Sequence, residues 1–246
     1  MKINNVSSEQ AVNQVNKNTK VLSENIERLS SGKEVNKFSD NSAQAAQVVS
    51  LNNKDKALRQ VDKNLNQGTS YLQVAESGMN EVSSILTRLK ELSVQGASDT
   101  VNDNDRSLID LEVNQLKEEI NRISENTKYN NESLLNGAGR SISLLAGEDV
   151  NSSNYIALDL SKLNVSTSKL GVSGLSVASQ SDSQSAVQEV DDALTALAEQ
   201  RALVSSVSSR LQFSISNNST QQVNNSSAKS KIEDLDYARE MSEYTS

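Results

Sequence analysis

The sequence predicts a mainly α-helical protein, an elongated antiparallel helical bundle or coiled-coil rod with a small β-hairpin insert. The chain of 246 residues contains no proline and only 9 glycines, so little in it would break a long helix. Apolar residues recur every three or four positions over several long stretches, which is the spacing of one helical face. Only 35% of the residues are hydrophobic and 3% aromatic, too few for a large spherical core. We therefore expect helices that bury a narrow apolar stripe.

The first helical stretch lies in an N-terminal segment, residues 1–40. Its apolar side follows steps of three and four residues through Val12, Val15, Thr19, Leu22, Ile26 and Leu29. The terminal seam is defined as Val12, Val15, Leu22, Ile26 and Leu29. The seam has no intramolecular partner of matching length except the end of the chain, which favours packing against another chain.

Residues 41–136 carry the second and third helical stretches. A helix from about residue 41 to 95 would be roughly 80 Å long at about 1.5 Å per residue. Its apolar positions are Leu51, Leu58, Val61, Leu65, Gly68, Leu72, Ala75, Met79, Val82, Leu86 and Leu89. After a polar loop at 96–105, whose acidic residues together with Ser107 can cap the next helix, a third seam contains Ile109, Val113, Leu116, Ile120 and Ile123. The short loop predicts that these two helices pack antiparallel.

The spacing of apolar residues changes in residues 137–180, from the helical period to alternation. Gly137 and Gly139 punctuate the chain, and Ile156, Leu158 and Leu160 alternate with other residues, which predicts a short β-hairpin or small sheet. Helical spacing returns in residues 181–232 at Val190, Leu194, Leu197, Ala198, Val204, Val207, Leu211 and Ile215, and thins out from 216 to 227. Residues 233–246 begin a last amphipathic segment. Because it stops in what reads as mid-helix, we expect the chain to continue past Ser246 or to lack a partner.

Composition excludes much chemistry. The net charge is −8, and the chain has no His, Cys or Trp, so a Ser-His-Asp triad, a Cys nucleophile, the usual zinc ligands and disulfides are ruled out. An acidic chain without a dense Lys/Arg block lacks the footprint of a nucleic-acid binder. No apolar run reaches the roughly 20 residues that span a bilayer, and the N-terminus lacks the apolar core of a signal peptide. We expect no enzyme, no cofactor, no bound metal, no nucleic-acid partner and no membrane segment.

Three further patterns are weaker candidates for sites. The acidic loop with Asp99, Asp103 and Asp105 fails as a calcium loop, since position six from Asp103 is Leu108, so capping is the better interpretation. Adjacent carboxylates (Glu118 with Glu119, Asp191 with Asp192) point about 100° apart on a helix and do not suit glycosidase chemistry. Asn151-Ser-Ser and Asn164-Val-Ser fit the N-glycosylation pattern, which arises often by composition alone.

Several ordered motifs carry a family resemblance. They are Ile26-Glu-Arg-Leu-Ser-Ser-Gly32, Arg88-Leu-Lys-Glu-Leu-Ser-Val-Gln95, Glu118-Glu-Ile-Asn-Arg-Ile123, Thr127-Lys-Tyr-Asn-Asn-Glu-Ser-Leu-Leu-Asn-Gly137, Val190-Asp-Asp-Ala-Leu194, Gln200-Arg-Ala202, Ser214-Ile-Ser-Asn217 and Ile232-Glu-Asp-Leu-Asp-Tyr-Ala238. With these motifs the chain resembles bacterial flagellin, the subunit of the flagellar filament, over almost its whole length apart from the β insert. The resemblance implies a structural subunit that self-assembles into a homo-oligomeric helical filament for swimming motility.

The resemblance also implies partners and a location. Flagellins leave the cell unfolded through the flagellar export apparatus, with a chaperone, and are secreted and extracellular, as parts of the bacterial flagellum. In the family, the positions that match Arg88, Leu92 and Glu112 lie on a rod surface that packs against neighbouring subunits and contacts a Toll-like innate immune receptor. The alternative for these three residues is that Leu92 belongs to the core and the charges are merely solvated.

Two other functions stay open at this point. A hook-filament junction protein would share the terminal motifs but be present in few copies, and a non-polymerising coiled-coil adhesin or binding module would not assemble. For a filament subunit we expect terminal segments that are disordered in the monomer and ordered in the polymer, so that residues 1 to about 35 are protease-sensitive in the monomer.

Overall fold

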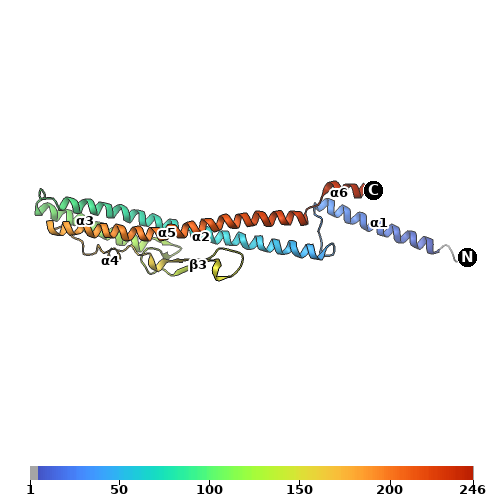
Figure 1. Cartoon of the computed structure of the whole chain (residues 1–246), viewed down its shortest axis with the longest axis horizontal. Helices are drawn as coiled ribbons and strands as arrows, with labels where there is room; N and C mark the ends of the chain where they lie inside the picture. The colour runs from blue at the N-terminus through green and yellow to red at the C-terminus, as the bar shows by residue number, and fades with distance from the viewer. Residues whose placement is uncertain (1–4, 246) are drawn as a thin grey trace. The chain divides into compact units, whose positions relative to one another are not determined.

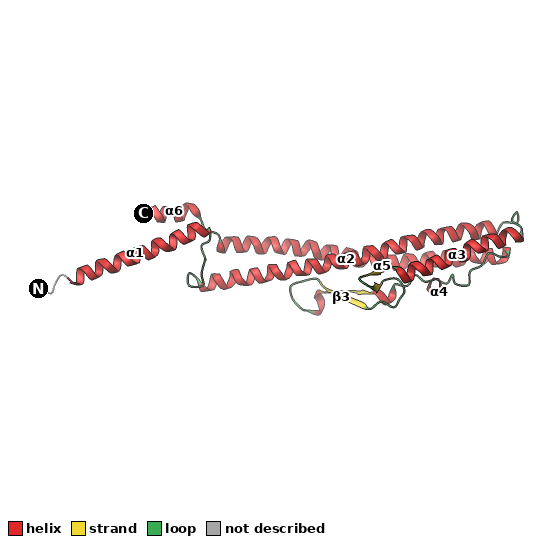
Figure 2. Cartoon of the chain, turned by 180° about the vertical axis from the view of Figure 1, so that it is seen from behind, coloured by secondary structure: helices red, strands yellow, loops and turns green. Residues whose placement is uncertain are grey.

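The computed structural model describes residues 5–245 and confirms the mainly α-helical fold, with 74% of the described residues helical. The helices are α1 (Asn5–Ser31), α2 (Ser42–Gly96), α3 (Asp103–Asn126), α4 (Thr167–Leu170), α5 (Gln180–Glu233) and α6 (Tyr237–Thr245) (Figure 1). The strands are β1 (Lys128–Tyr129), β2 (Glu132–Ser133), β3 (Ser141–Leu145) and β4 (Tyr155–Asp159), with two 3₁₀ turns, η1 (Ser152–Asn154) and η2 (Leu160–Lys162) (Figure 2).

The chain divides into two compact units. Among the described residues, the first unit contains 5–59 and 218–245, and the second contains 60–217, so α2 and α5 contribute to both. None of the helices in the described chain combines the length and the apolar character needed to cross a membrane.

In the second unit, α2 and α5 run antiparallel. Lys90 Nζ of α2 lies 2.6 Å from Asp191 Oδ1 of α5, whereas Gly68, further back on α2, faces Leu211, further along α5. As the residue number falls along one helix, it rises along the other. The two halves of the rod are therefore paired by residues that are more than a hundred positions apart in the chain.

Helix α3 folds back along α2, as the sequence predicted. Arg88 near the end of α2 pairs with Glu112 of α3, and the space above Gly78, earlier on α2, is filled by Thr127, just after α3. The loop between the helices is short, and the N-cap of α3 is Asn102, whose side chain accepts a hydrogen bond from Asp105 N. The cap is therefore Asn102 rather than Ser107, with Asp103 and Asp105 in the first helical turn, where negative charge is favourable.

The corner between α2 and α3 is held by Arg106, a residue that sequence reasoning did not single out. Its guanidinium is 7% exposed. Nε donates to Gly96 O at 2.8 Å, Nη2 donates to Ser98 O at 2.9 Å, and Nη1 pairs with Asp103 at 2.8 Å. Gly96 is buried and ends α2, so its carbonyl has no partner within the helix, and Arg106 satisfies it. The partly buried Ser98 O also accepts from Val101 N at 3.3 Å.

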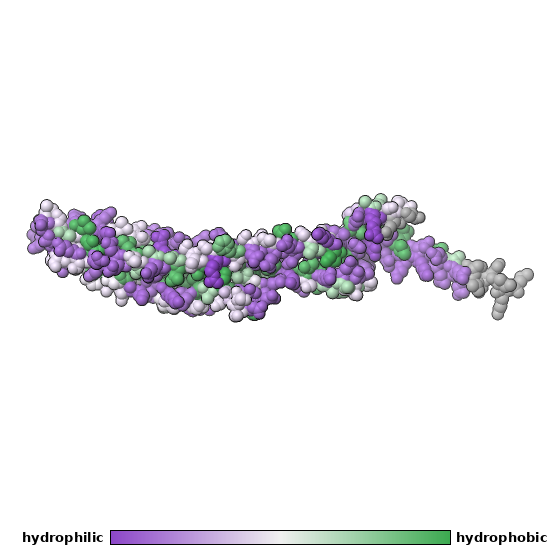
Figure 3. Space-filling view, viewed as in Figure 1, coloured by the Kyte–Doolittle hydropathy of each residue, from purple (hydrophilic) through white to green (hydrophobic). Residues whose placement is uncertain are grey.

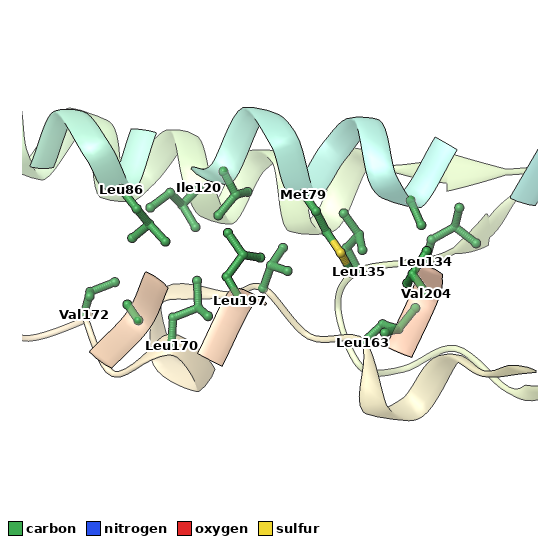
Figure 4. Close-up of a cluster of buried hydrophobic side chains, with 14 of the residues drawn as sticks. Met79, Leu86, Ile120, Leu134, Leu135, Leu163, Leu170, Val172, Leu197 and Val204 are labelled. Atoms are coloured by element: carbon green, nitrogen blue, oxygen red, sulfur yellow. The ribbon is translucent and has the colours of Figure 1, made fainter. Parts of the chain in front are cut away.

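The core of the second unit is the apolar stripe that the helical spacing predicted. On α2 it comprises Val61, Leu65, Leu72, Ala75, Met79, Val82, Leu86, Leu89 and Leu92, all at most 4% exposed. Met79 and Leu86 of α2 and Ile120 of α3 point toward Leu197 and Val204 of α5 (Figure 4). On α5 one predicted core position is wrong: Ala198 is exposed, and the buried alanines are Ala186 and Ala193. The helix continues through the polar stretch 216–227, where the apolar pattern thins out.

The insert contains the predicted hairpin. Strands β3 and β4 pair antiparallel, with Ile142 opposite Leu158 and Leu144 opposite Ile156. Ile156 and Leu158 alternate with exposed neighbours and are both 4% exposed, so one face of the hairpin joins the core. The chain that follows adds Leu163, Leu170 and Val172 to the same cluster (Figure 4).

A second, smaller hairpin was not predicted. Strands β1 and β2 pair Lys128 with Ser133 and Tyr129 with Glu132 across a two-residue turn. Both turn residues have positive φ, +48° at Asn130 and +66° at Asn131, a conformation that asparagine tolerates better than most residues. The Asn-Asn pair is the signal that the sequence offers for this turn.

Replacing Arg106 by methionine should lower the free energy of unfolding by about 2–3 kcal/mol, because the charged hydrogen bonds to Gly96 O and Ser98 O are lost while Gly96 stays buried without a partner for its carbonyl. The measurement is urea denaturation of the full chain. Arg122→Met is the matched control: the exposed Arg122 pairs only with Glu119 one turn away, so its loss should change stability by no more than about 0.5 kcal/mol. Equal losses in both variants would contradict the role given to Arg106.

Candidate functional site

The terminal seam lies on α1, and most of it faces solvent. Val12, Val15, Leu22 and Ile26 are 57%, 62%, 44% and 49% exposed, and Leu29 is half-buried. Such exposure is unusual for apolar residues repeated at helical spacing. From Val12 to Ile26, the terminal seam is therefore an apolar surface that is exposed to solvent on the isolated chain.

Helix α6 packs against the C-terminal part of α1 in the first unit (Figure 1). The contact centres on a buried carboxylate, Glu240, which is 6% exposed. Arg28 Nη1 lies 3.9 Å from Glu240 Oε1, and the Asn25 amide, with its nitrogen facing this carboxylate, donates to the same oxygen at 3.2 Å. Because polar groups inside a helix pair must find partners, these contacts select one register of α6 on α1.

The segments that lead out of α1 and α5 are joined by backbone hydrogen bonds. Glu34 N donates to Glu233 O at 2.8 Å, and Leu235 N donates to Gly32 O at 3.1 Å. The Glu233 carboxylate sits between Lys33, at 2.5 Å, and Lys229, at 3.4 Å. Burial disfavours the charged carboxylate, but the hydrogen bond from Lys33 and the charges of both lysines outweigh it and hold the pKa of Glu233 below its ordinary value.

Of the three residues that the resemblance places on a rod surface, the structure brings Arg88 and Glu112 together at the surface but not Leu92. Arg88 Nε donates to Glu112 Oε1 at 3.0 Å, and Nη1 pairs with Glu91 at 3.0 Å. These hydrogen bonds, the one with Glu112 first, raise the pKa of Arg88. Arg88 and Glu112 are about half exposed, but Leu92 is 2% exposed and belongs to the core. Leu92 is therefore placed beneath this surface rather than on it, because the 3/4 spacing of α2 turns it inward with Leu89.

The acidic loop serves local structure. Asp99 accepts from Gln180 Nε2 at 2.5 Å, Asp103 pairs with Arg106, and Asp105 accepts from Asn102 Nδ2 at 2.7 Å. The three carboxylates thus have separate partners. Over the part of the chain that the structure describes, no group of three or more acidic side chains is placed to hold a metal ion.

The paired carboxylates also diverge. Glu119 bonds Arg122 on its own helix, whereas Asp191 reaches across to Lys90 of α2 and Asp192 accepts from Gln188. Glu119, Asp191 and Asp192 thus bind separate partners, as expected for carboxylates that point in different directions on a helix.

The two glycosylation triplets differ in their surroundings. Asn151 is exposed and precedes η1 in the loop between β3 and β4. Asn164 is partly buried, and Gln200 of α5 holds its backbone on both sides: Asn164 N donates to Gln200 Oε1, and Gln200 Nε2 donates to Asn164 O, each at 2.9 Å. Of the two, only Asn151 presents an open side chain.

Polar side chains on the helices hold the irregular chain between β4 and α5, and sequence reasoning missed them. Asp110 Oδ1 accepts from Val177 N at 2.8 Å, Lys117 Nζ donates to Leu175 O at 2.7 Å, and Asn121 Oδ1 accepts from Thr167 N at 3.0 Å. All three come from one face of α3, at a spacing of seven and four residues. That spacing was visible in the sequence, but nothing in it marked which backbone groups these side chains would meet.

Figure 3 shows one face of the molecule coloured by hydropathy. On the second unit, hydrophilic residues cover most of this face, and hydrophobic residues form smaller separate patches. The second unit consists of long antiparallel helices around a buried stripe, and α1 carries an exposed apolar seam. These features are typical of rod-like subunits that pack against copies of themselves.

Comparison with known proteins identifies the family. The bacterial flagellin N-terminal helical region matches residues 3–140, and the bacterial flagellin C-terminal helical region matches residues 187–246. A flagellin of Listeria monocytogenes is 34% identical over 258 residues, covering 100% of this chain and 90% of the relative. A flagellin of Halalkalibacterium halodurans is 34% identical over 220 residues, covering 89% of this chain and 80% of the relative. The chain belongs to the bacterial flagellin family.

A solved structure shares the fold. The crystal structure of Bacillus cereus flagellin matches with a TM-score of 0.56 at 24% sequence identity, over 63% of this chain and 88% of that one.

Proposed function

We infer that the chain is a structural subunit of the bacterial flagellar filament. The observation that carries this inference is the match to flagellins along the whole chain, at both helical regions. Full-length relatives named flagellin favour the filament over the hook-filament junction and over a binding module that does not polymerise. The role is structural rather than catalytic, and swimming motility is the activity that such a filament serves.

The inference is tested by quantitative peptide mass spectrometry of filaments sheared from the source cells. We expect peptides of this chain to dominate the filament. Trace amounts would instead support the junction role, and their absence from abundant filaments would support the binding module. Because the readout is stoichiometry in the assembled filament, it separates these functions without a mutation.

We propose that the terminal seam is an assembly surface of this subunit. Val12 and Val15 are more than half exposed although they lie on one helical face, and covering them by another subunit would remove that apolar area from water. Residues 5–31 are helical in the structure, with α6 on their C-terminal end. That this segment becomes ordered only on assembly, and is protease-sensitive in the monomer, remains part of the proposal.

Val15→Asp should impair polymerisation without unfolding the second unit. A carboxylate placed in a buried seam must be desolvated, and a loss of about 1.4 kcal/mol already raises the critical concentration about tenfold. The control is Asn13→Asp, which adds the same charge on roughly the opposite side of α1. Sedimentation of polymer against subunit concentration measures the effect, and equal critical concentrations for the two variants would rule out the seam.

We also propose that the surface marked by Arg88 and Glu112 packs against neighbouring subunits and is the contact for a Toll-like innate immune receptor. The two side chains are fixed to each other and yet about half exposed, so they present an ordered charged pair to a partner. Leu92 has no direct part in this proposal, because it lies in the core.

A charge exchange separates an internal role of this pair from an external one. Arg88→Glu should lose the ion pair, at a stability cost of no more than about 1 kcal/mol for exposed charges. The double variant Arg88→Glu with Glu112→Arg restores the pair but reverses what a partner meets. We expect the double variant to regain stability in thermal denaturation and to stay defective in polymerisation. Full recovery of polymerisation would mean that the pair acts only within the subunit.

We propose in addition that the chain reaches the cell exterior through the flagellar export apparatus, with a chaperone on the way. Membership of the flagellin family supports this route.

A further inference from the structure

The Asn136–Gly137 step is the one place in this sequence where an asparagine precedes a glycine. It lies where the chain leaves the small β1–β2 hairpin and enters the insert. Gly137 has a positive φ of +73°, and Asn136 forms an isolated antiparallel bridge with Asn164. An asparagine followed by glycine is chemically labile, since no Cβ on the next residue shields the backbone nitrogen.

The lability has a defined course. The backbone nitrogen of Gly137 loses its proton and attacks Cγ of Asn136, so that an N–Cγ bond forms, the Cγ–Nδ2 bond breaks and ammonia leaves. Water then opens the resulting five-membered succinimide. Opening at one carbonyl gives aspartate at position 136, and opening at the other gives isoaspartate, in which the main chain runs through the former side chain. No oxidant and no enzyme are needed, and water is the only co-reactant.

The folded insert holds both reacting groups in other bonds. Gly137 N donates to Leu163 O at 3.0 Å, so its proton is engaged, and Asn136 Oδ1 accepts from Ala138 N at 3.0 Å, which fixes the side-chain amide. The Asn164 side chain also covers Gly137: a Cβ at this glycine would lie 2.7 Å from Asn164 Nδ2. Attack on Cγ would have to break the two hydrogen bonds first.

The surroundings make this arrangement rigid. On the other side of Asn136, Val165 N donates to Leu135 O at 2.9 Å. Leu135, Leu163 and Val165 are each at most 1% exposed, so the two segments are fixed by the core. From α5, Gln200 holds the backbone of Asn164 by the two hydrogen bonds described above. Freeing Asn136 therefore requires the insert to open.

We propose that Asn136 is a latent site of spontaneous deamidation, which folding of the insert switches off. The modification occurs in chains that are unfolded, or whose insert has opened, and not in the native subunit. This inference stands on the geometry of the insert and does not depend on the proposed function.

Modification would in turn oppose folding. Isoaspartate adds one carbon to the main chain between the two hydrogen bonds that flank position 136, Val165 N to Leu135 O and Gly137 N to Leu163 O. The two segments could then no longer meet in register between buried residues. Either product also places a negative charge next to the core. A chain that remains unfolded for long thus becomes less able to fold.

The test compares the full chain in native buffer and in concentrated urea, at one mildly alkaline pH and one temperature. Deamidation is followed at each asparagine by peptide mass spectrometry with isoaspartate detection, and the exposed Asn151, which precedes Ser152, is the internal reference. We expect Asn136 to be the fastest site in urea and to react at least about tenfold more slowly in the native chain, the factor that an opening free energy of about 1.4 kcal/mol gives. Equal rates at Asn136 in the two conditions would overturn the proposal, as would a slow Asn136 in urea.

Two variants make the test sharper. Asn136→Gln lengthens the side chain, which disfavours the five-membered ring, and should abolish the signal at this position in urea. Gln200→Ala removes the support of Asn164 from α5 and should raise the native rate at Asn136 several-fold, while Gln188→Ala, an exposed change on the same helix, should leave it unchanged. An unaltered rate in a folded Gln200→Ala chain would contradict the gating. If that variant unfolds, its rate should equal the rate in urea, and a lower rate would contradict it as well.

Discussion

Burial of one apolar stripe on α2 is the constraint on which the second unit depends. The stripe from Val61 to Leu92 belongs to one buried cluster with side chains of α3, α5 and the insert. With so few aromatic residues in the chain, the stabilisation comes from aliphatic side chains, each worth about 2–5 kcal/mol when truncated to alanine in a well-packed core. The helices are long because a narrow stripe must be extended to bury enough area.

In the insert, polar side chains from the helices supply the backbone hydrogen-bond partners that neighbouring strands supply in a regular sheet. Apart from its two short hairpins, the chain between α3 and α5 has little ladder pairing, and its backbone groups must still be satisfied where they are buried. Asp110, Lys117 and Asn121 on α3 and Gln200 on α5 supply these partners. The insert is thus fixed to the helices from two sides, although it has almost no sheet of its own.

Sequence periodicity was enough for the long helices and the β3–β4 hairpin, because both depend on local spacing of apolar residues. It also predicted a helix over the residues of the terminal seam. It could not decide that Leu92 is core while Arg88 is surface, since that depends on which neighbours surround α2. The roles of Arg106 and Gln200 could not be predicted for a related reason. Both side chains bind backbone carbonyls and amides that come near them only in the folded chain. Asn130 and Asn131 carried a usable turn signal, which the preceding helical pattern obscured.

The pairing of α2 with α5 has a consequence for the order in which the protein can form during synthesis. Lys90 meets Asp191 across 101 positions, and Leu211 closes over Gly68 still later in the chain. While the ribosome is making the insert, the stripe on α2 has only α3 to cover it. The core is completed only after Leu211 has been made, and the loop that must close is long. The second unit of the nascent subunit therefore stays incomplete until much of α5 has been translated.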